Sequence, residues 1–403
     1  MIYPKTYALY QKLYKAYFSA RKNKRNKRSQ LCFEWQYEQE IDKLYNEIVH
    51  YAYEPSAPNV FVIKKPVLRE IFAPQFRDRV VHHLIYNYIY QYLDKKFIYD
   101  SYSCRLQKGT SFGVKRAAQF MRRVSENYTK DAYVLKLDIR GYFMQMNRNI
   151  LHEKINQMLD YEALKITNTE RVYLQYLIRK VVMHDAARRP RLCASPQEWK
   201  KVPCAKSLFH APPNCGLPIG SLTSQLFSNV YLNELDHFVK SELKIKYYGR
   251  YVDDMLFMHR SKDYLQQVID SVACELHKIG LSLHPQKIKL KHYKYGVEFL
   301  GRYLLPGRIY LSNRCKKQVK NFQAKFCQDW ENAQVYVWQV INPINSYLGI
   351  LSEHNTYRLK QEFVEKLPQS LYYYYHLEDK GSSCKLSLNK EYNPKYKYAL
   401  VDL

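Results

Sequence analysis

Hydrophobic side chains along this chain follow two spacings, one typical of helices and the other typical of strands. Runs rich in Val, Ile, Tyr and Phe predict a hairpin at 59–74, a strand at 132–138 and a second hairpin at 247–260. The combination predicts an α+β fold with an antiparallel sheet. Apolar recurrence every three or four residues predicts helices in residues 3–20, 33–51, 77–93, 150–183, 222–238, 262–279 and in two stretches after 313.

Prolines, glycines and cations mark the segments between these elements. Residues 101–113 (SYSCRLQKGTSFG) mix cations with Gly and Ser, which predicts a loop. Residues 184–214 contain the prolines of an irregular insertion. The chain ends in a tyrosine-rich tail whose role the sequence does not give.

Charge is the strongest feature of the composition. The 403 residues include 64 Lys and Arg against 37 Asp and Glu, a formal net charge of +27. Such an excess creates a positive field that attracts polyphosphates. No run approaches the ~20 apolar residues that span a bilayer, and residues 1–5 begin no signal-peptide core. We therefore expect a soluble, cytoplasmic protein with no membrane partner.

The N-terminal region combines aromatic and basic side chains. Tyrosines at helical spacing form a stripe that either packs in the core or stacks on RNA bases. The run RKNKRNKR, from Arg21 to Arg28, predicts a solvated arm that contacts phosphates, with an idle solubilising loop as the alternative. The stripe comprises Tyr3, Tyr7, Tyr10, Tyr14 and Tyr17.

The nine cysteines are scattered, odd in number and contain no CxxC pair, so we expect reduced thiols. Cys193, Cys204 and Cys215, with His210 among them, offer an alternative zinc site. Their spacing matches none of the compact zinc-knuckle patterns, which argues against that alternative.

Two adjacent acids form the sharpest chemical feature of the chain. Asp253 and Asp254 stand in YYGRYVDDMLFMH, where the second hairpin is predicted to turn. An acidic surface turn is the alternative, because Asp is a favoured turn residue. The apolar neighbours Met255 and Leu256 make a fully solvated turn the weaker interpretation.

A third acid, Asp138, ends the predicted strand AYVLKLD. Neighbouring strands lie ~4.8 Å apart, so a hairpin beside that strand would gather Asp138, Asp253 and Asp254. Such a cluster needs cations to stay ionised. Two Mg²⁺ ions about 3.5 to 4 Å apart would neutralise it, activate a primer 3′-hydroxyl and stabilise a pyrophosphate leaving group.

Nearby cations are candidates for binding a triphosphate or a template backbone. Gly216 to Gly220 (GLPIG) predict a turn where backbone approaches a nucleotide, with an ordinary loop-to-helix junction as the alternative. Lys287, in GLSLHPQKIKL, is a candidate proton donor to the leaving group. The candidate cations are Lys64, Lys65 and Arg69 on the first hairpin and Arg105 and Lys108 in the loop after it, and each alone is more typical of a solvated side chain.

Seven blocks in series resemble the reverse transcriptases: a basic hairpin, SYSCR…KG, D-IRGYF, GLPIG, YVDD, GLSLHPQK and VEFLG. The resemblance covers about residues 60–305 and implies a right-hand polymerase fold. Within that superfamily the chain is most similar to reverse transcriptases of diversity-generating retroelements. The similarity is carried by LREIFAPQFRDRVVHHL, SYSCR, KSLF, GLPIGSLTSQLFSNVYLNELD, YYGRYVDDMLF and NSYLG.

The resemblance implies a role for each matching residue. Asp138, Asp253 and the Ile139 backbone resemble the metal ligands, with Asp254 beside them. Phe143 resembles the gate that excludes a ribose 2′-hydroxyl, and Lys287 the proton donor. The resemblance places Lys65 and Arg69 in a triphosphate clamp, and Ile219, Gly220 and Gln225 beside the incoming nucleotide.

At position 219 this chain has Ile, whereas many reverse transcriptases carry Gln there. A branched apolar side chain loses hydrogen bonds near the incoming nucleotide, which would loosen discrimination. The family copies a template-repeat RNA into cDNA with adenine-directed errors. Its implied partners are template RNA, primer or cDNA, dNTPs and a small, basic, helical accessory protein.

The resemblance also implies domain boundaries. We expect a basic helical extension at 1–58, fingers at 59–130, a palm at 131–305 that includes the 184–214 insertion, and a helical thumb with the tyrosine-rich tail at 306–403.

Three alternatives stay open. A retron or defence-linked reverse transcriptase is weakened because the NAxxH and VTG signatures are absent. A group II intron maturase is weakened because IGSLTSQ replaces its QGG-type block and no HNH segment is evident. In the third alternative the chain is a non-catalytic basic RNA-binding scaffold whose acids are structural.

Overall fold

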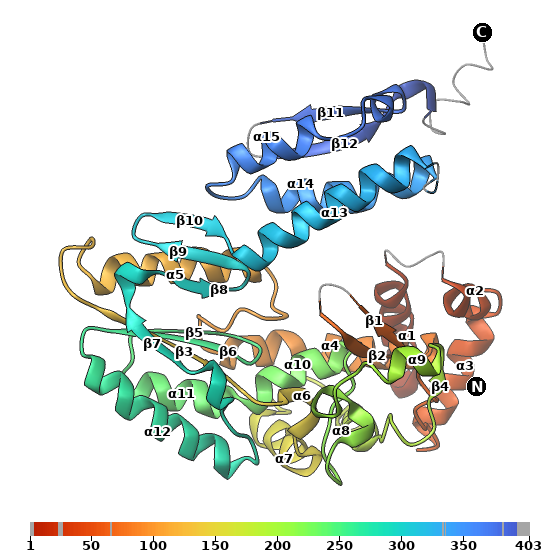
Figure 1. Ribbon diagram of the computed structural model, residues 1–403. Coiled ribbons are helices and arrows are strands. Elements are labelled where there is room, and N and C mark those ends of the chain that lie inside the picture. The colour runs from red at the N-terminus through yellow and green to blue at the C-terminus, as the bar shows by residue number, and fades with distance from the viewer. Residues whose placement is uncertain are drawn as a thin grey trace. The chain divides into compact units, whose positions relative to one another are not determined.

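Figure 1 shows the computed structural model of the chain. The structure describes residues 4–22, 27–64, 67–332, 334, 336–380 and 383–392. The chain forms two compact units, one of Met1–Arg116 with Tyr133–Leu290 and one of Ala117–Ala132 with Lys291–Leu403. Both units combine helices and strands, so the predicted α+β class is confirmed. The predicted extension, fingers, palm and thumb boundaries remain a prediction.

The first unit begins with three helices, α1 (Pro4–Arg21), α2 (Arg28–Glu34) and α3 (Tyr37–Val49). Helices α1 and α2 pack with α4 (Phe76–Lys96), and α3 packs with α1 and α2. The helix predicted at 33–51 is confirmed over Tyr37–Val49, but its start is wrong, because the chain leaves helical geometry at Gln36 (φ −132°, ψ 41°). Tyr10, Tyr14 and Tyr17 contact the rings of Tyr37 and Tyr45 on α3, with centroid distances of 5.4 to 6.3 Å.

These contacts pack the described part of the tyrosine stripe against α3, with Tyr10 and Tyr14 partly buried. Tyr17 is buried, and its ring stacks on Tyr37 at 5.4 Å. The alternative of RNA stacking is therefore wrong for Tyr17. Tyr3 and the side chain of Tyr7 lie outside the described residues.

A small sheet follows the N-terminal helices. β1 (Asn59–Ile63) and β2 (Arg69–Ala73) pair antiparallel, which confirms the predicted first hairpin. β4 (Arg191–Leu192) adds a parallel strand to β1. The 184–214 insertion is otherwise α9 (Pro196–Trp199) and the short turns η1 (Cys204–Lys206) and η2 (Leu208–His210).

Helices supply most of the remaining first unit. The predicted loop at 101–113 is wrong at its end, because α5 (Thr110–Val124) begins at Thr110. The helix predicted at 222–238 divides at Leu232 (φ −102°, ψ 6°). The others are α6 (Tyr142–Gln145), α7 (Arg148–Met158), α8 (Asn168–Met183), α10 (Leu222–Tyr231), α11 (Asn233–Ser241) and α12 (Lys262–Lys278).

A four-stranded sheet forms the centre of the first unit. It contains β5 (Tyr247–Tyr251), β6 (Asp254–His259), β3 (Tyr133–Asp138) and β7 (Lys289–His292), in that spatial order. The predicted strand at 132–138 and hairpin at 247–260 are confirmed. Leu135 and Leu137 pair with Phe257 and Met255, and all four are buried in the main core. This burial fixes the register, because a slip of one residue would move these apolar side chains to the opposite face of the sheet.

The second unit has its own core. β8 (Val297–Phe299), β9 (Arg302–Leu305) and β10 (Arg308–Leu311) form a three-stranded meander. Helix α13 (Asn313–Glu331) follows, and the second predicted helical stretch divides into α14 (Val337–Leu351) and α15 (Tyr357–Glu365).

The tyrosine-rich tail is partly a hairpin of β11 (Tyr375–Asp379) and β12 (Cys384–Leu388), with Tyr375 buried in that core. Single turns occur at η3 (Pro285–Lys287), η4 (Tyr293–Tyr295), η5 (Gln369–Tyr373) and η6 (Lys390–Tyr392). In the described residues, the helices are all too short or too polar to cross a membrane.

Candidate active site

Strand pairing brings the acids of the chain to one end of the central sheet. β3 ends at Asp138 and β6 begins at Asp254, and the antiparallel register sets these two residues opposite each other. β5 ends at Tyr251, which pairs with Asp254, so Val252 and Asp253 form the turn between β5 and β6. The structure therefore gathers Asp138, Asp253 and Asp254, as the sequence predicts.

The turn itself has an unusual backbone. Val252 has a φ of 55°, and positive φ is unfavourable for a β-branched residue because its side chain crowds the backbone. A positive φ at the first central residue suits the twist of a tight hairpin. Backbone outliers of this kind typically cost about 1–3 kcal/mol and gather at functional sites.

The three carboxylates interact electrostatically. Burial, followed by the negative charges of Asp254 and Asp138, raises the pKa of Asp253 to about 6. Lys287 Nζ lies 2.7 Å from Asp138 Oδ1, and Lys136 Nζ lies 3.1 Å from Asp254 Oδ1. The charges of Asp254 and Asp138 thus disfavour ionisation of Asp253, and lysines pair with Asp138 and Asp254.

Carboxylate oxygens are the ligands that Mg²⁺ prefers, and a repelling set of them fits a divalent cation. Within the described ranges, however, no group of three or more His, Cys, Asp or Glu side chains stands in metal-holding geometry. An ion that bound Asp138 and Asp254 would therefore compete with the ammonium groups of Lys287 and Lys136.

Residues 280–287 run beside the end of β3. Arg140 N donates to Ser282 O at 2.9 Å, and His284 N donates to Asp138 O at 2.8 Å. Ile139, which is buried, forms an isolated bridge with Leu283. These bonds bring Lys287, whose side chain is half exposed, to Asp138.

Phe143 and the GLPIG segment lie together. Leu217 N donates to Phe143 O at 2.8 Å. Phe143 and Ile219 are both half-buried and pack against one apolar cluster. That cluster comprises Val60, Phe72, Met144, Ala186 and Leu208.

The same segment contacts the first hairpin. Phe72 N donates to Ile219 O at 2.8 Å. Gly220 has a φ of 125°, and a Cβ there would lie 2.8 Å from Phe72 O, so the close approach requires glycine. Gln225 is exposed on α10.

The predicted triphosphate cations are only partly described. Lys65 lies outside the described residues. Arg69 is exposed at the start of β2. Burial is the largest cause that raises the pKa of Tyr251, and the positive charge of Arg69 lowers it. Arg69 therefore lies near Tyr251, the last residue of β5. Lys64 pairs with Glu198 at 2.8 Å.

Arg105 contacts neighbouring residues of the protein. Its side chain is 6% exposed and pairs with Asp94 at 2.6 Å. It also donates to the carbonyl oxygens of Ile98, Ser101 and Asp94. The donors of Arg105 thus hold the loop together, and its predicted contact with nucleic acid stays a prediction.

Lys108, Arg21 and Arg28 are the other residues that the sequence predicts to contact nucleic acid. Lys108 donates to Tyr99 O, and burial lowers its pKa to about 8. Arg21 pairs with Glu34 at 2.8 Å. Arg28 is exposed, and residues 23–26 between these arginines lie outside the described ranges.

The alternative zinc site finds no support. Cys193, Cys204 and His210 are exposed and Cys215 is half-buried. None of them belongs to a metal-holding group in the part of the chain that the structure describes.

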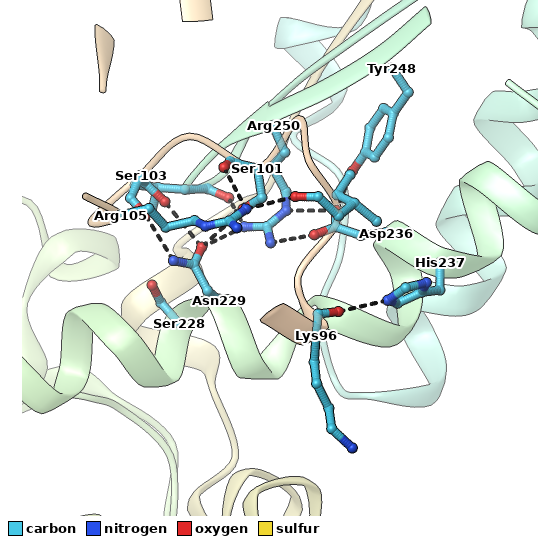
Figure 2. Close-up of polar contacts among 12 residues, drawn as sticks. Lys96, Ser101, Ser103, Arg105, Ser228, Asn229, Asp236, His237, Tyr248 and Arg250 are labelled. Carbon is cyan, nitrogen blue, oxygen red and sulfur yellow. Dashed lines mark hydrogen bonds and ion pairs between the residues drawn. The ribbon is translucent and has the colours of Figure 1, made fainter. Parts of the chain in front are cut away.

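Sequence reasoning missed a buried polar network behind the turn, which Figure 2 shows. Arg250, Asp236 and Asn229 are fully buried. Arg250 forms a two-bond ion pair with Asp236, at 2.8 and 2.6 Å. A cation within the otherwise aromatic strand YYGRY was the signal for this network.

Gly249, beside that arginine, predicts a stability effect. A Cβ at Gly249 would lie 2.2 Å from the hydroxyl oxygen of Tyr102, whose ring is buried. We expect Gly249→Ala to lower the free energy of unfolding by about 3 kcal/mol, because overpacking forces the strand and the ring apart. Urea unfolding measures this loss, with Gly349→Ala on α14 as the control, because its Cβ would meet no atom within 4 Å. A stable Gly249→Ala protein would contradict the close approach.

Comparisons with known proteins identify the family. A model of the reverse transcriptase (RNA-dependent DNA polymerase) family matches residues 63–304. A comparison with curated proteins gave no match.

Solved structures of telomerase are similar in part. Apo telomerase from Candida tropicalis, truncated from its C-terminal domain, has 16% identity and a TM-score of 0.46, over 66% of this chain and 59% of that chain. Telomerase from Candida albicans in complex with a TWJ fragment of telomeric RNA has 13% identity and a TM-score of 0.48, over 86% and 60%. This chain thus spans less than two thirds of both telomerase chains. Because these TM-scores are low, the assignment rests on the family model, and the chain belongs to the reverse transcriptase family, the RNA-dependent DNA polymerases.

Proposed function

We propose that this chain copies RNA into DNA by two-metal nucleotidyl transfer at Asp138, Asp253 and Asp254. The observation that carries the proposal is the register of β3 and β6, which sets Asp138 opposite Asp254, with Asp253 in the adjoining turn. Template RNA, a primer or growing cDNA and dNTPs are the proposed partners, and the net charge of +27 suits all of them.

The chain's own residues have separate proposed tasks. Asp138, Asp253, the Ile139 carbonyl and Asp254 would hold two Mg²⁺ ions, which supply charge stabilisation and an activated primer 3′-hydroxyl. The primer 3′-hydroxyl gives its proton to water, its oxygen bonds to the α-phosphorus of the dNTP, and the bond to pyrophosphate breaks. Lys287, which bonds to Asp138 at 2.7 Å, gives a proton to the departing pyrophosphate.

Neighbouring residues shape the nucleotide site in this proposal. Arg69 and Lys65 bind the triphosphate, and Arg28 and Lys108 contact the nucleic acid backbone. Phe143 and Ile219, which pack against one cluster, face the sugar and base, with Gly220 and Gln225 beside them.

Incorporation of dNTPs on a primed RNA tests the proposal. We expect extension with Mg²⁺, none when EDTA removes it, and RNA binding under both conditions. A protein that binds the primed RNA but never extends it would favour the RNA-binding scaffold instead.

We further propose that the RNA copied is the template repeat of a diversity-generating retroelement, with adenine-directed errors in the cDNA. Support comes from the blocks LREIFAPQFRDRVVHHL and YYGRYVDDMLF and from Ile219. A small, basic, helical accessory protein is the proposed partner, and the cytoplasm, which holds dNTPs and RNA, is the proposed location.

The side chain at position 219 yields a fidelity prediction. We expect Ile219→Gln to lower misincorporation opposite template adenine by about three- to tenfold, because the amide restores a hydrogen bond that selects the nucleotide. Sequencing of the cDNA from one RNA template measures the change. Ile219→Leu, which stays apolar, serves as the control and keeps the error rate. An error spectrum that is the same in all three proteins would show that position 219 does not set fidelity.

A further inference from the structure

The buried Arg250–Asp236 pair lies directly behind the acidic turn. Both side chains have no exposed surface. Burying an ion pair is costly, and apolar replacements often stabilise a fold as well or better. The pair therefore calls for an explanation other than stability.

The guanidinium of Arg250 bonds to more than the aspartate. Nε and Nη2 form the fork with Asp236, while Nη1 donates to the carbonyl oxygen of Val252 at 3.0 Å. Nη1 also lies 3.4 Å from Asn229 Oδ1. One cation thus joins α11, α10 and the turn between β5 and β6.

Further bonds hold the partners of Arg250 in place. The Tyr248 hydroxyl donates to Asp236 Oδ1 at 2.7 Å. Asn229 Nδ2 donates to Ser103 O at 2.8 Å, and Ser103 Oγ donates to Asn229 Oδ1 at 3.1 Å (Figure 2). The guanidinium therefore has little freedom to move.

The Val252 carbonyl belongs to the peptide group that leads into Asp253. A peptide group is planar, so a bond that holds its oxygen also holds the plane of the whole Val252–Asp253 peptide. The nitrogen and Cα of Asp253 lie in that plane and are held with it. Val252 carries the unfavourable φ of 55°, so the turn needs support to keep this conformation.

We propose that Arg250, held by Asp236, is a positioning residue that keeps the Val252–Asp253 peptide in the conformation that aims Asp253 at the metal ions. The inference rests on the proposed polymerase function. It predicts that the guanidinium fork matters, because an ammonium group cannot bond to Asp236 twice and to Val252 O at once.

The central variant is Arg250→Lys, which keeps the charge. We expect it to bind Mn²⁺, measured by EPR of the free ion, about tenfold more weakly than the unsubstituted protein. On primed RNA we expect kcat to fall about 10²-fold, as for a displaced reacting group, with the KM for primed RNA unchanged. The Mn²⁺ affinity separates this role from one in general stability, because a loss of folded protein lowers the number of Mn²⁺ sites but not their affinity.

Arg116→Lys is the matched control. Arg116 forms a similar fork with Asp100, at 2.7 and 3.0 Å, so the same chemical change is made at another buried aspartate. We expect unchanged Mn²⁺ affinity and kcat in this variant. Equal losses in Arg250→Lys and Arg116→Lys, or no loss in Arg250→Lys, would overturn the proposal.

A double variant, Arg250→Met with Asp236→Leu, covers the case in which Arg250→Lys does not fold. It removes both charges together, which buried pairs tolerate, and circular dichroism reports its fold. A folded double variant should show the Mn²⁺ and kcat losses expected of Arg250→Lys. Normal Mn²⁺ affinity, or failure of both variants to fold, would overturn the positioning role. An unsubstituted protein that binds Mn²⁺ but does not extend primers would instead refute the polymerase function.

Discussion

Asp253→Asn is expected to lower dNTP incorporation by about 10³-fold or more. The substitution removes a negative charge that holds the metal ions, and those ions stabilise the transition state by several kcal/mol. Asp253 lies in the turn between β5 and β6, and burial, followed by the charges of Asp254 and Asp138, raises its pKa. The amide keeps the shape of the side chain but cannot carry the negative charge that a metal ion requires. Single-turnover extension of a primed RNA measures the loss.

RNA binding should survive this substitution, since the proposed contacts to phosphate come from cations elsewhere. Asp270→Asn, at an exposed position on α12, makes the same change away from the three acids and should leave the rate unchanged. An unchanged rate in Asp253→Asn would sink the two-metal assignment. Loss of RNA binding together with activity would point to a folding defect.

Phe143→Ala is expected to raise incorporation of ribonucleotides relative to deoxyribonucleotides by about 10²-fold, the scale on which a pocket rejects one extra small group. The Phe143 ring is half-buried and lies 5.5 Å from the Tyr142 ring at 61°. The bond from Leu217 N fixes its backbone beside the GLPIG segment. Removing the ring would open space for a 2′-hydroxyl.

The measurement is the ratio of kcat/KM for an rNTP to that for the matching dNTP, on one folded protein. Phe143→Tyr retains the ring and should retain the discrimination. A ratio that stays the same in Phe143→Ala would show that another side chain excludes the ribose.

Local patterns predicted the elements that carry the acids. Runs of apolar and aromatic residues predicted β3, β5 and β6, and the pairing of β3 with β6 buries Leu135, Leu137 and Phe257. Once these strands pair, the meeting of Asp138 with Asp254 needs no further information. This is why the acidic site could be found from the sequence.

Contacts between distant segments could not be predicted in the same way. Helix breaks at Gln36 and Leu232 interrupt continuous apolar periods, and the periods do not mark them. Arg105 has the sequence context of a phosphate ligand, but Asp94 and three carbonyls occupy it. The Arg250 ion pair depends on packing between α11 and β5, which a local pattern does not contain.

In the proposed reaction, Asp138, Asp253 and Asp254 hold two metal ions together. EPR of Mn²⁺ bound to the chain with a chain-terminated primer, its RNA template and a dNTP detects such a pair. We expect a magnetically coupled pair of Mn²⁺ ions, which Asp253→Asn abolishes. Isolated Mn²⁺ ions only, in equal number in both proteins, would contradict the two-metal site.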